Sequence, residues 1–174
     1  MDDVRMMFRF LEAGGPCADH ADELMLFGQF VGSWDLDIKA FDGDGVARTF
    51  AGEWHFGWAL EGRAVQDVLI TRSLQGEVVG FGSTVRSFDP KRDLWWIVWQ
   101  DPLAGEFSVL LARAAEGDRI VLEGQWTIGD PPQHFRWTFS DITADSFHWE
   151  GHLLDGGGRW QLAEAMHARR FSRS

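Results

Sequence analysis

Residues 50–72 read FAGEWHFGWALEGRAVQDVLITR, a pattern that much of the chain repeats. Every second residue in the first half of this stretch shares one face: Phe50, Gly52, Trp54, Phe56, Trp58 and Leu60. Glu53 and His55 fall on the opposite face, as in a strand that is apolar on one side and polar on the other. Glu61 and Gly62 then form a turn, and a second β-rich run follows to residue 72. The stretch therefore predicts an antiparallel hairpin.

Short turns rich in Gly, Asp or Pro continue this arrangement on both sides of the hairpin. They lie at residues 42–45, 61–62, 74–77, 89–93, 101–105, 116–118, 130–132, 143–146 and 155–158. This spacing, with no helical pattern between the turns, predicts an all-β, up-and-down antiparallel sheet that closes into a single barrel and so hides its edges. A closed barrel encloses a volume, and such a volume usually holds a ligand.

About ten strands follow from the alternation of apolar and polar residues. We expect them at residues 34–40, 50–60, 62–72, 78–88, 94–100, 106–114, 119–128, 133–142, 146–154 and 160–170. One short helix is predicted at residues 21–30, capped by Asp19 and ended by Gly32, with Leu24 and Phe27 on its apolar side. Residues 1–18 form an N-terminal arm, and residues 19–172 form the barrel domain.

Tryptophan and phenylalanine dominate the apolar residues of this chain, with 10 Trp, 14 Phe and no Tyr among 174 residues. This much tryptophan suits the wall of a wide apolar cavity, although the same side chains could simply fill a barrel core. The tryptophans that we expect to line a lumen are Trp54, Trp58, Trp96, Trp126, Trp137 and Trp149. A small apolar or aromatic molecule is therefore the predicted partner.

The formal net charge of −11 and the lack of a Lys- and Arg-rich run argue against nucleic acid and anionic membranes as partners. A neutral or cationic apolar ligand is compatible with this charge. Cys17 is the single cysteine, so no intrachain disulfide and no thiolate metal site is expected. The N-terminal residues resemble no secretory signal, and no stretch is long enough to span a membrane, so a cytoplasmic location is expected.

Gly32-Ser33-Trp34, which opens the first strand after a short helix, resembles the Gly-x-Trp signature of the lipocalin and calycin superfamily. In that superfamily the Trp packs at the closed end of the barrel beneath a basic residue from the last strand, which implies Arg169 or Arg170 here. Residues 88–90, 95–99 and 155–160 are also similar to motifs of uncharacterised bacterial lipocalin-like proteins. Some ten-stranded relatives bind haem, for which His55, His134, His148 or His152 would be the axial ligand; no cofactor is predicted.

The turn at residues 143–146 sets the register of the strands on either side of it. It places Arg136 near His152, Ser140 near His148 and Thr138 near Glu150, all on one polar face. This face is either solvated or lines the lumen; in the second case Arg136, His148 and His152 would contact a ligand. The His-x-Glu-x-His spacing on one strand is a weak metal signal, and no metal site is predicted.

Glu164 alternates with Trp160, Leu162 and Met166, so it falls on an apolar face. If the 156–158 turn offsets the register by one residue, Glu164 lies beside Trp149, where loss of water would raise its pKa and suit it to general acid or base catalysis. The alternative is a Glu164 in water or paired with an arginine. Glu53 and His55 form a second acid–imidazole pair, or part of a surface salt-bridge ladder.

Three functions follow from these residues. The first is binding of a small apolar or aromatic molecule inside the cell, in the lumen. The second is a cofactor-free isomerase, cyclase or lyase in which Glu164, with His148, His152 or His55, moves protons. The third is an interaction module that forms a homodimer through exposed Trp95 and Trp99. No phosphate loop, dinucleotide fingerprint or serine nucleophile motif is present.

Overall fold

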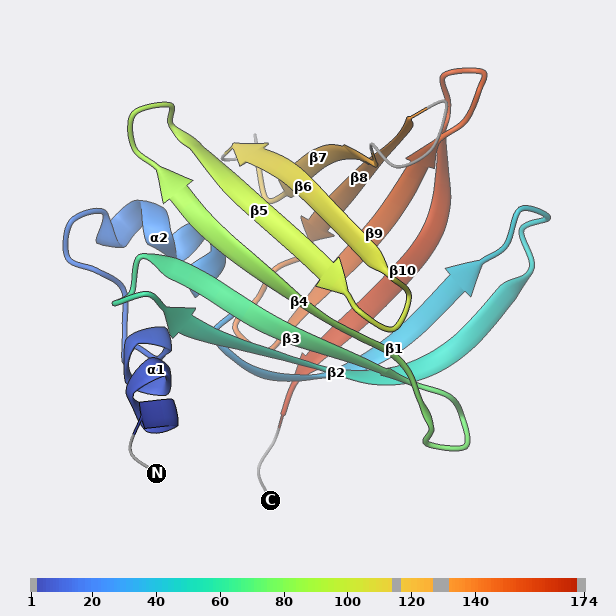
Figure 1. Ribbon diagram of the computed structural model, residues 1–174. Helices are drawn as coiled ribbons and strands as arrows, with labels where there is room; N and C mark the ends of the chain where they lie inside the picture. The colour runs from blue at the N-terminus through green and yellow to red at the C-terminus, as the bar shows by residue number, and fades with distance from the viewer. Residues whose placement is uncertain (1–2, 114–116, 127–131, 172–174) are drawn as a thin grey trace.

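Ten antiparallel strands close into one barrel in the computed structural model, which describes residues 3–113, 117–126 and 132–171 (Figure 1). Each strand pairs with its neighbours in the chain, and the first and last strands pair along Trp34–Arg170 to Ala40–Glu164. The strands are β1 (Gly32–Phe41), β2 (Ala47–Ala59), β3 (Ala64–Arg72), β4 (Val78–Asp89), β5 (Leu94–Asp101), β6 (Glu106–Arg113), β7 (Ile120–Trp126), β8 (Gln133–Ser140), β9 (Ser146–Leu154) and β10 (Trp160–Arg170). The predicted barrel is confirmed.

The register of β8 against β9 is the predicted one. Arg136 lies opposite His152, Ser140 opposite His148, and Phe139 opposite Trp149. Phe139 is buried, whereas His148 is exposed, so the aromatic face points inward and the polar face, apart from the half-buried His152, points to solvent. The burial of apolar side chains selects this orientation, because a one-residue slip would expose the whole aromatic set.

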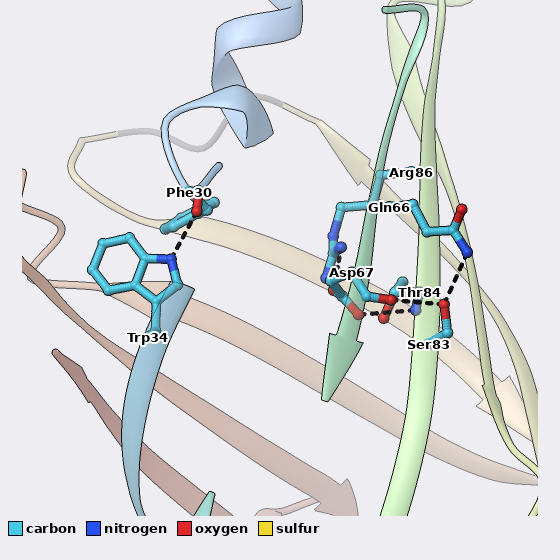
Figure 2. Close-up of polar contacts among 7 residues, drawn as sticks. All are labelled: Phe30, Trp34, Gln66, Asp67, Ser83, Thr84 and Arg86. Atoms are coloured by element: carbon cyan, nitrogen blue, oxygen red, sulfur yellow. Dashed lines mark hydrogen bonds and ion pairs between the residues drawn. The ribbon is translucent and has the colours of Figure 1, made fainter. Parts of the chain in front are cut away.

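Helix α2 (Ala21–Gly28) and the residues after it close one end of the barrel. Phe27 and Phe30 are fully buried, and the indole N–H of Trp34 donates to the Phe30 carbonyl at 2.7 Å (Figure 2). The Arg170 guanidinium lies 4.1 Å from the centroid of the Trp34 ring and donates to the Val31 carbonyl at 3.0 Å. Arg170 therefore takes the position over Trp34, while Arg169 pairs with an acid on the outer face.

The start of α2 differs from the expectation. The residue before the helix is His20, with φ 133°, and no side chain caps the helix, so the prediction of Asp19 as the cap is wrong. A second helix, α1 (Asp3–Leu11), lies in the N-terminal arm, where no helix is predicted from the sequence. After this helix, Ala13 forms an isolated antiparallel β-bridge with Trp58. No helix in the described part of the chain is long and apolar enough to cross a membrane.

The two faces of β5 were assigned wrongly. Trp95 is only 2% exposed, and its ring centroid lies 4.9 Å from that of Phe27; Trp99 also points inward. The outward tryptophan is Trp96, which is 42% exposed. Because the strand is apolar on both faces, alternation alone could not choose between them. The expected homodimer face of Trp95 and Trp99 is therefore interior.

Candidate functional site

A cavity of about 190 Å³, here called the inner cavity, lies in the lumen. Buried aromatic side chains separate it from the end of the barrel that α2 closes. Its wall is mostly apolar and contains five tryptophans, which come from five different strands: Trp54, Trp99, Trp126, Trp137 and Trp149. A second hollow of about 290 Å³, the outer hollow, adjoins it. Leu69, Trp99, Glu106 and Glu164 line both. The two spaces together form a path from the inner cavity toward the open rim.

Four of the six tryptophans predicted for the wall line the inner cavity: Trp54, Trp126, Trp137 and Trp149. Trp58 lies instead at the closed end, where its ring occupies the space beside Gly28 of α2. Trp96 lies on the outer face, with its indole N–H 3.4 Å from Asp89. The predictions of Trp58 and Trp96 as cavity residues therefore fail on position. Trp99, three residues further along β5, lines the cavity instead, because strand residues an odd number of positions apart face opposite sides of the sheet.

Glycines make room for two of the wall tryptophans. A Cβ on Gly82 would lie 2.1 Å from the ring of Trp99, and a Cβ on Gly151 would lie 2.8 Å from the ring of Trp149. Both distances are too short for any side chain. The six-membered ring of each tryptophan therefore occupies the space that a side chain at the glycine would fill.

The wall tryptophans also contact one another. Ring centroids are 5.7 Å apart for Trp137 and Trp149, 6.0 Å for Trp99 and Trp137, and 6.4 Å for Trp54 and Trp149. Two of these pairs are edge-to-face, an arrangement that aromatic quadrupoles favour. The wall is thus a connected aromatic set that presents a shaped apolar surface.

Four polar atoms on the cavity wall have no hydrogen-bond partner among the described residues: Trp54 Nε1, Trp149 Nε1, Thr84 Oγ1 and His152 Nδ1. The side chains of Trp54, Trp149 and Thr84 are buried, and Thr84 is only 1% exposed. By contrast, the indole N–H of Trp126 donates to Ser108. Because an unpaired buried donor costs roughly 1–3 kcal/mol, these groups favour a molecule in the cavity that offers an acceptor.

A bulge in β10 turns Glu164 toward the lumen. Leu162 lies opposite His152 and Glu164 opposite Gly151, so Ala163 is an extra residue. Burial raises the pKa of Glu164 to about 7, and the negative charge of Glu106 adds to the rise. This position agrees with the expectation of a lumenal carboxylate. Glu164 lies opposite Gly151, which is the next inward-facing residue of β9 after Trp149. No hydrogen bond holds Glu164 among the described residues, so its carboxyl is free to act on a ligand.

The predicted histidines lie in different places. His55 is on the outer face, between Ser33 at 2.9 Å and Glu53 at 3.2 Å, and His148 is also outside, 3.0 Å from Asp141. His152 alone lines the inner cavity, and its Nδ1 is buried without a partner among the described residues. Glu164 and His152 are therefore the predicted acid–base residues that the fold brings to the cavity.

The residues do not fit haem. His134, His55 and His148 are on outward-facing positions, and the inner cavity that His152 lines, at about 190 Å³, is smaller than the ~300–1,000 Å³ of pockets for drug-sized ligands. A porphyrin is too large for this space.

Arg136 is on the outer face of β8. Its Nε donates to Glu123 at 2.9 Å, and its guanidinium lies 4.3 Å from the centroid of the Trp160 ring. The interpretation of Arg136 as a lumenal ligand contact is therefore replaced by a surface ion pair with a cation–π contact.

A buried ion pair lies between the inner cavity and α2. Arg86 Nη1 is 2.5 Å from Asp67 Oδ2, and both side chains are fully buried (Figure 2). Asp67 Oδ1 also accepts the backbone N–H of Thr84 at 2.9 Å, and the Arg86 guanidinium lies 5.3 Å from the Phe27 and Phe56 ring centroids. This pair was missed, because neither residue stands in a recognisable motif. It fixes Thr84 at the cavity floor.

No protein-family model and no curated protein matches this chain. The solved structures of similar fold include two that align with most of this chain. Rv2717c from M. tuberculosis aligns over 87% of this chain and 99% of its own, with a TM-score of 0.65 and 14% identity. The S-type phycobiliprotein lyase CPES from Guillardia theta aligns over 86% and 93%, with a TM-score of 0.63 and 11% identity. At these identities the likeness shows the fold alone, a closed antiparallel β-barrel.

Proposed function

We propose that the barrel binds a small aromatic molecule in the inner cavity. The observation that carries this proposal is a tryptophan-lined cavity whose wall holds buried indole N–H groups without partners among the described residues. A protein interior normally fills such space and pairs such donors. A flat ligand with an acceptor would contact the rings and accept from the indoles at the same time.

The volume of the inner cavity limits the size of the ligand. At about 190 Å³ it is slightly larger than an engineered cavity of about 150 Å³ in another protein that takes up benzene. One aromatic ring with a short substituent therefore fits the inner cavity. A second ring would extend into the outer hollow, which shares four residues with it.

A neutral dye with three aromatic rings, which extends from the inner cavity into the outer hollow, tests this proposal. N-phenyl-1-naphthylamine is expected to bind with saturable enhancement of its fluorescence and quenching of tryptophan emission. Ala163→Phe places a ring in the inner cavity and should abolish binding, whereas Trp96→Phe removes one tryptophan from the outer face and should leave the dye affinity unchanged. Equal binding by both variants and the wild type would locate the dye outside the lumen and end the proposal.

The second candidate function is cofactor-free acid–base catalysis on such a ligand. It is favoured by Glu164, whose pKa is raised to about 7 by burial, beside a cavity that His152 also lines. A carboxyl with this pKa can both donate and accept a proton at neutral pH. Glu164→Gln should retain aromatic ligands in either case. Conversion of a bound compound by the wild type that is lost in this variant would establish the enzyme.

A further inference from the structure

Among the described residues, all the charged side chains that line the outer hollow, at the mouth of the lumen, are acidic. Asp101, Glu106 and Glu164 line the outer hollow, and the last two also line the inner cavity. No lysine or arginine is among the described residues that line either space. Asp101 is occupied as the acceptor for the backbone N–H groups of Leu103 and Ala104. Glu106 accepts one weak hydrogen bond, from the indole N–H of Trp99 at 3.5 Å, and Glu164 accepts none among the described residues, so both carboxylates keep oxygens available to a ligand.

Keeping the charged form of Glu164 in this place costs folding free energy. It is surrounded by apolar wall, the nearby Glu106 repels its charge, and it has no ion pair among the described residues. A buried carboxylate normally has a cationic or hydrogen-bonding partner. A ligand cation between the two glutamates would supply that partner.

The tryptophan wall independently favours a cation and orients the rest of the ligand. Trp99 lines both spaces beside the glutamates, and the faces of indole rings attract organic cations. Deeper in the lumen, the unpartnered N–H groups of Trp54 and Trp149 offer donors only. The lumen is thus acidic at its mouth and hydrogen-bond donating at its inner end.

Resting on the proposed binding function, we propose that the ligand is a small aromatic amine. Its ammonium group lies between Glu164 and Glu106. Its ring lies among the tryptophans, and an oxygen at the far end of the ring accepts from the indole N–H of Trp54 or Trp149. The overall negative charge of the protein, −11, attracts such a cation to the rim.

The affinity for the amine should depend on pH through Glu164. Charged or titratable groups reach its surroundings from four strands: Glu106 from β6, Asp101 from β5, His152 from β9, and Arg48, which stands in the same cross-strand row beyond Ala40. Arg48 is exposed and has no ion pair with Glu164 among the described contacts. Because the pKa of Glu164 is raised to about 7, the amine should bind more tightly at pH 8 than at pH 6.

Three phenols that share the 4-hydroxyphenyl ring and end in groups of different charge test the proposal: tyramine (cation), tyrosol (neutral alcohol) and 4-hydroxyphenylacetate (anion). Each is titrated against bound N-phenyl-1-naphthylamine at pH 8. We expect tyramine to displace the dye at a concentration roughly tenfold lower than tyrosol, and the anion to be weakest. 2-Phenylethylamine, which lacks the phenol oxygen, should bind more weakly than tyramine.

Two double variants test whether the preference for tyramine over tyrosol comes from the two glutamates at the mouth of the lumen. Glu106→Gln with Glu164→Gln should reduce the tyramine preference to about twofold or less, because both carboxylates are lost. Glu61→Gln with Glu123→Gln removes the same charge from exposed sites outside the lumen and should keep the full preference. Dye binding by both variants shows that they are folded.

The outcomes separate the two proposals. Displacement of the dye by tyramine and tyrosol at similar concentrations, or a preference that survives loss of both lumenal glutamates, overturns the aromatic amine and leaves the proposed binding function standing. Displacement by none of the phenols overturns the amine in the same way. Failure of the wild type to bind the dye ends the binding function and the amine together.

Discussion

At the scale of single residues, Glu164 makes the stability of the fold depend on pH. Its pKa is about 7 in the folded protein and near the ordinary 4.5 when unfolded, so the folded state holds more protons between these values. Stability therefore falls as the pH rises from about 4.5 through 7, and the loss is complete above 7. The penalty is on the order of 3 kcal/mol for a shift of this size.

Glu164→Gln should remove this penalty. Urea unfolding is expected to show a gain in the free energy of unfolding of a few kcal/mol at pH 8 and little change at pH 4. Glu61→Gln, on an exposed turn, serves as the control. An effect of Glu164→Gln that is the same at both pH values would mean that the carboxyl is solvated, and the description of the lumen would be wrong.

Asp67 and Arg86 form the most deeply buried ion pair of the described residues, and their energetics can be separated by a double-mutant cycle. Asp67→Asn alone should cost about 3–5 kcal/mol of unfolding free energy, because it leaves a buried guanidinium uncompensated. Asp67→Leu combined with Arg86→Met should cost clearly less than the sum of the costs of Asp67→Leu and Arg86→Met made singly. Additive costs, measured by urea unfolding, would contradict the pairing.

At the scale of elements, the shape of the lumen depends on glycines within strands. Gly82→Ala would place a Cβ 2.1 Å from the ring of Trp99, so the ring must move into the lumen. The dye affinity should therefore fall by roughly tenfold or more, with a smaller loss of stability. Gly57→Ala in β2 is the matched control, since a Cβ there meets no atom within 4 Å. Equal affinity in both variants would show that Trp99 does not shape the site.

The strands could be predicted because each is bounded by turn residues and most have a clear apolar face. β2 illustrates this, since its alternation fixes Trp54 inward and His55 outward. The β5 faces could not be predicted, because both Trp95 and Trp96 are large and apolar. Helix α1 was missed for a different reason: Arg5 and Arg9 break its apolar residues into short runs, although those residues do lie mainly on one side of the helix.

At the scale of the whole molecule, the site depends on closure of the barrel. Thr84, Trp99 and Glu106 come from three strands and were not recognised as site residues, because only the closed sheet brings them to one cavity. Glu164 could be recognised as a carboxylate on an apolar face, but its inward position depends on the bulge at Ala163. The pairing of successive strands can be predicted from the local sequence. The bulges and the contacts inside the lumen depend on the assembled barrel.

The location of a bound ligand is visible directly in the indole N–H signals of the ten tryptophans. Titration with N-phenyl-1-naphthylamine, followed by ¹H–¹⁵N NMR with assignments from single Trp→Phe variants, should shift the signals of one set. The expected set is Trp54, Trp99, Trp126, Trp137 and Trp149. The outer-face signal of Trp96 should stay in place. Shifts at Trp96 with an unchanged lumenal set would contradict ligand binding inside the barrel.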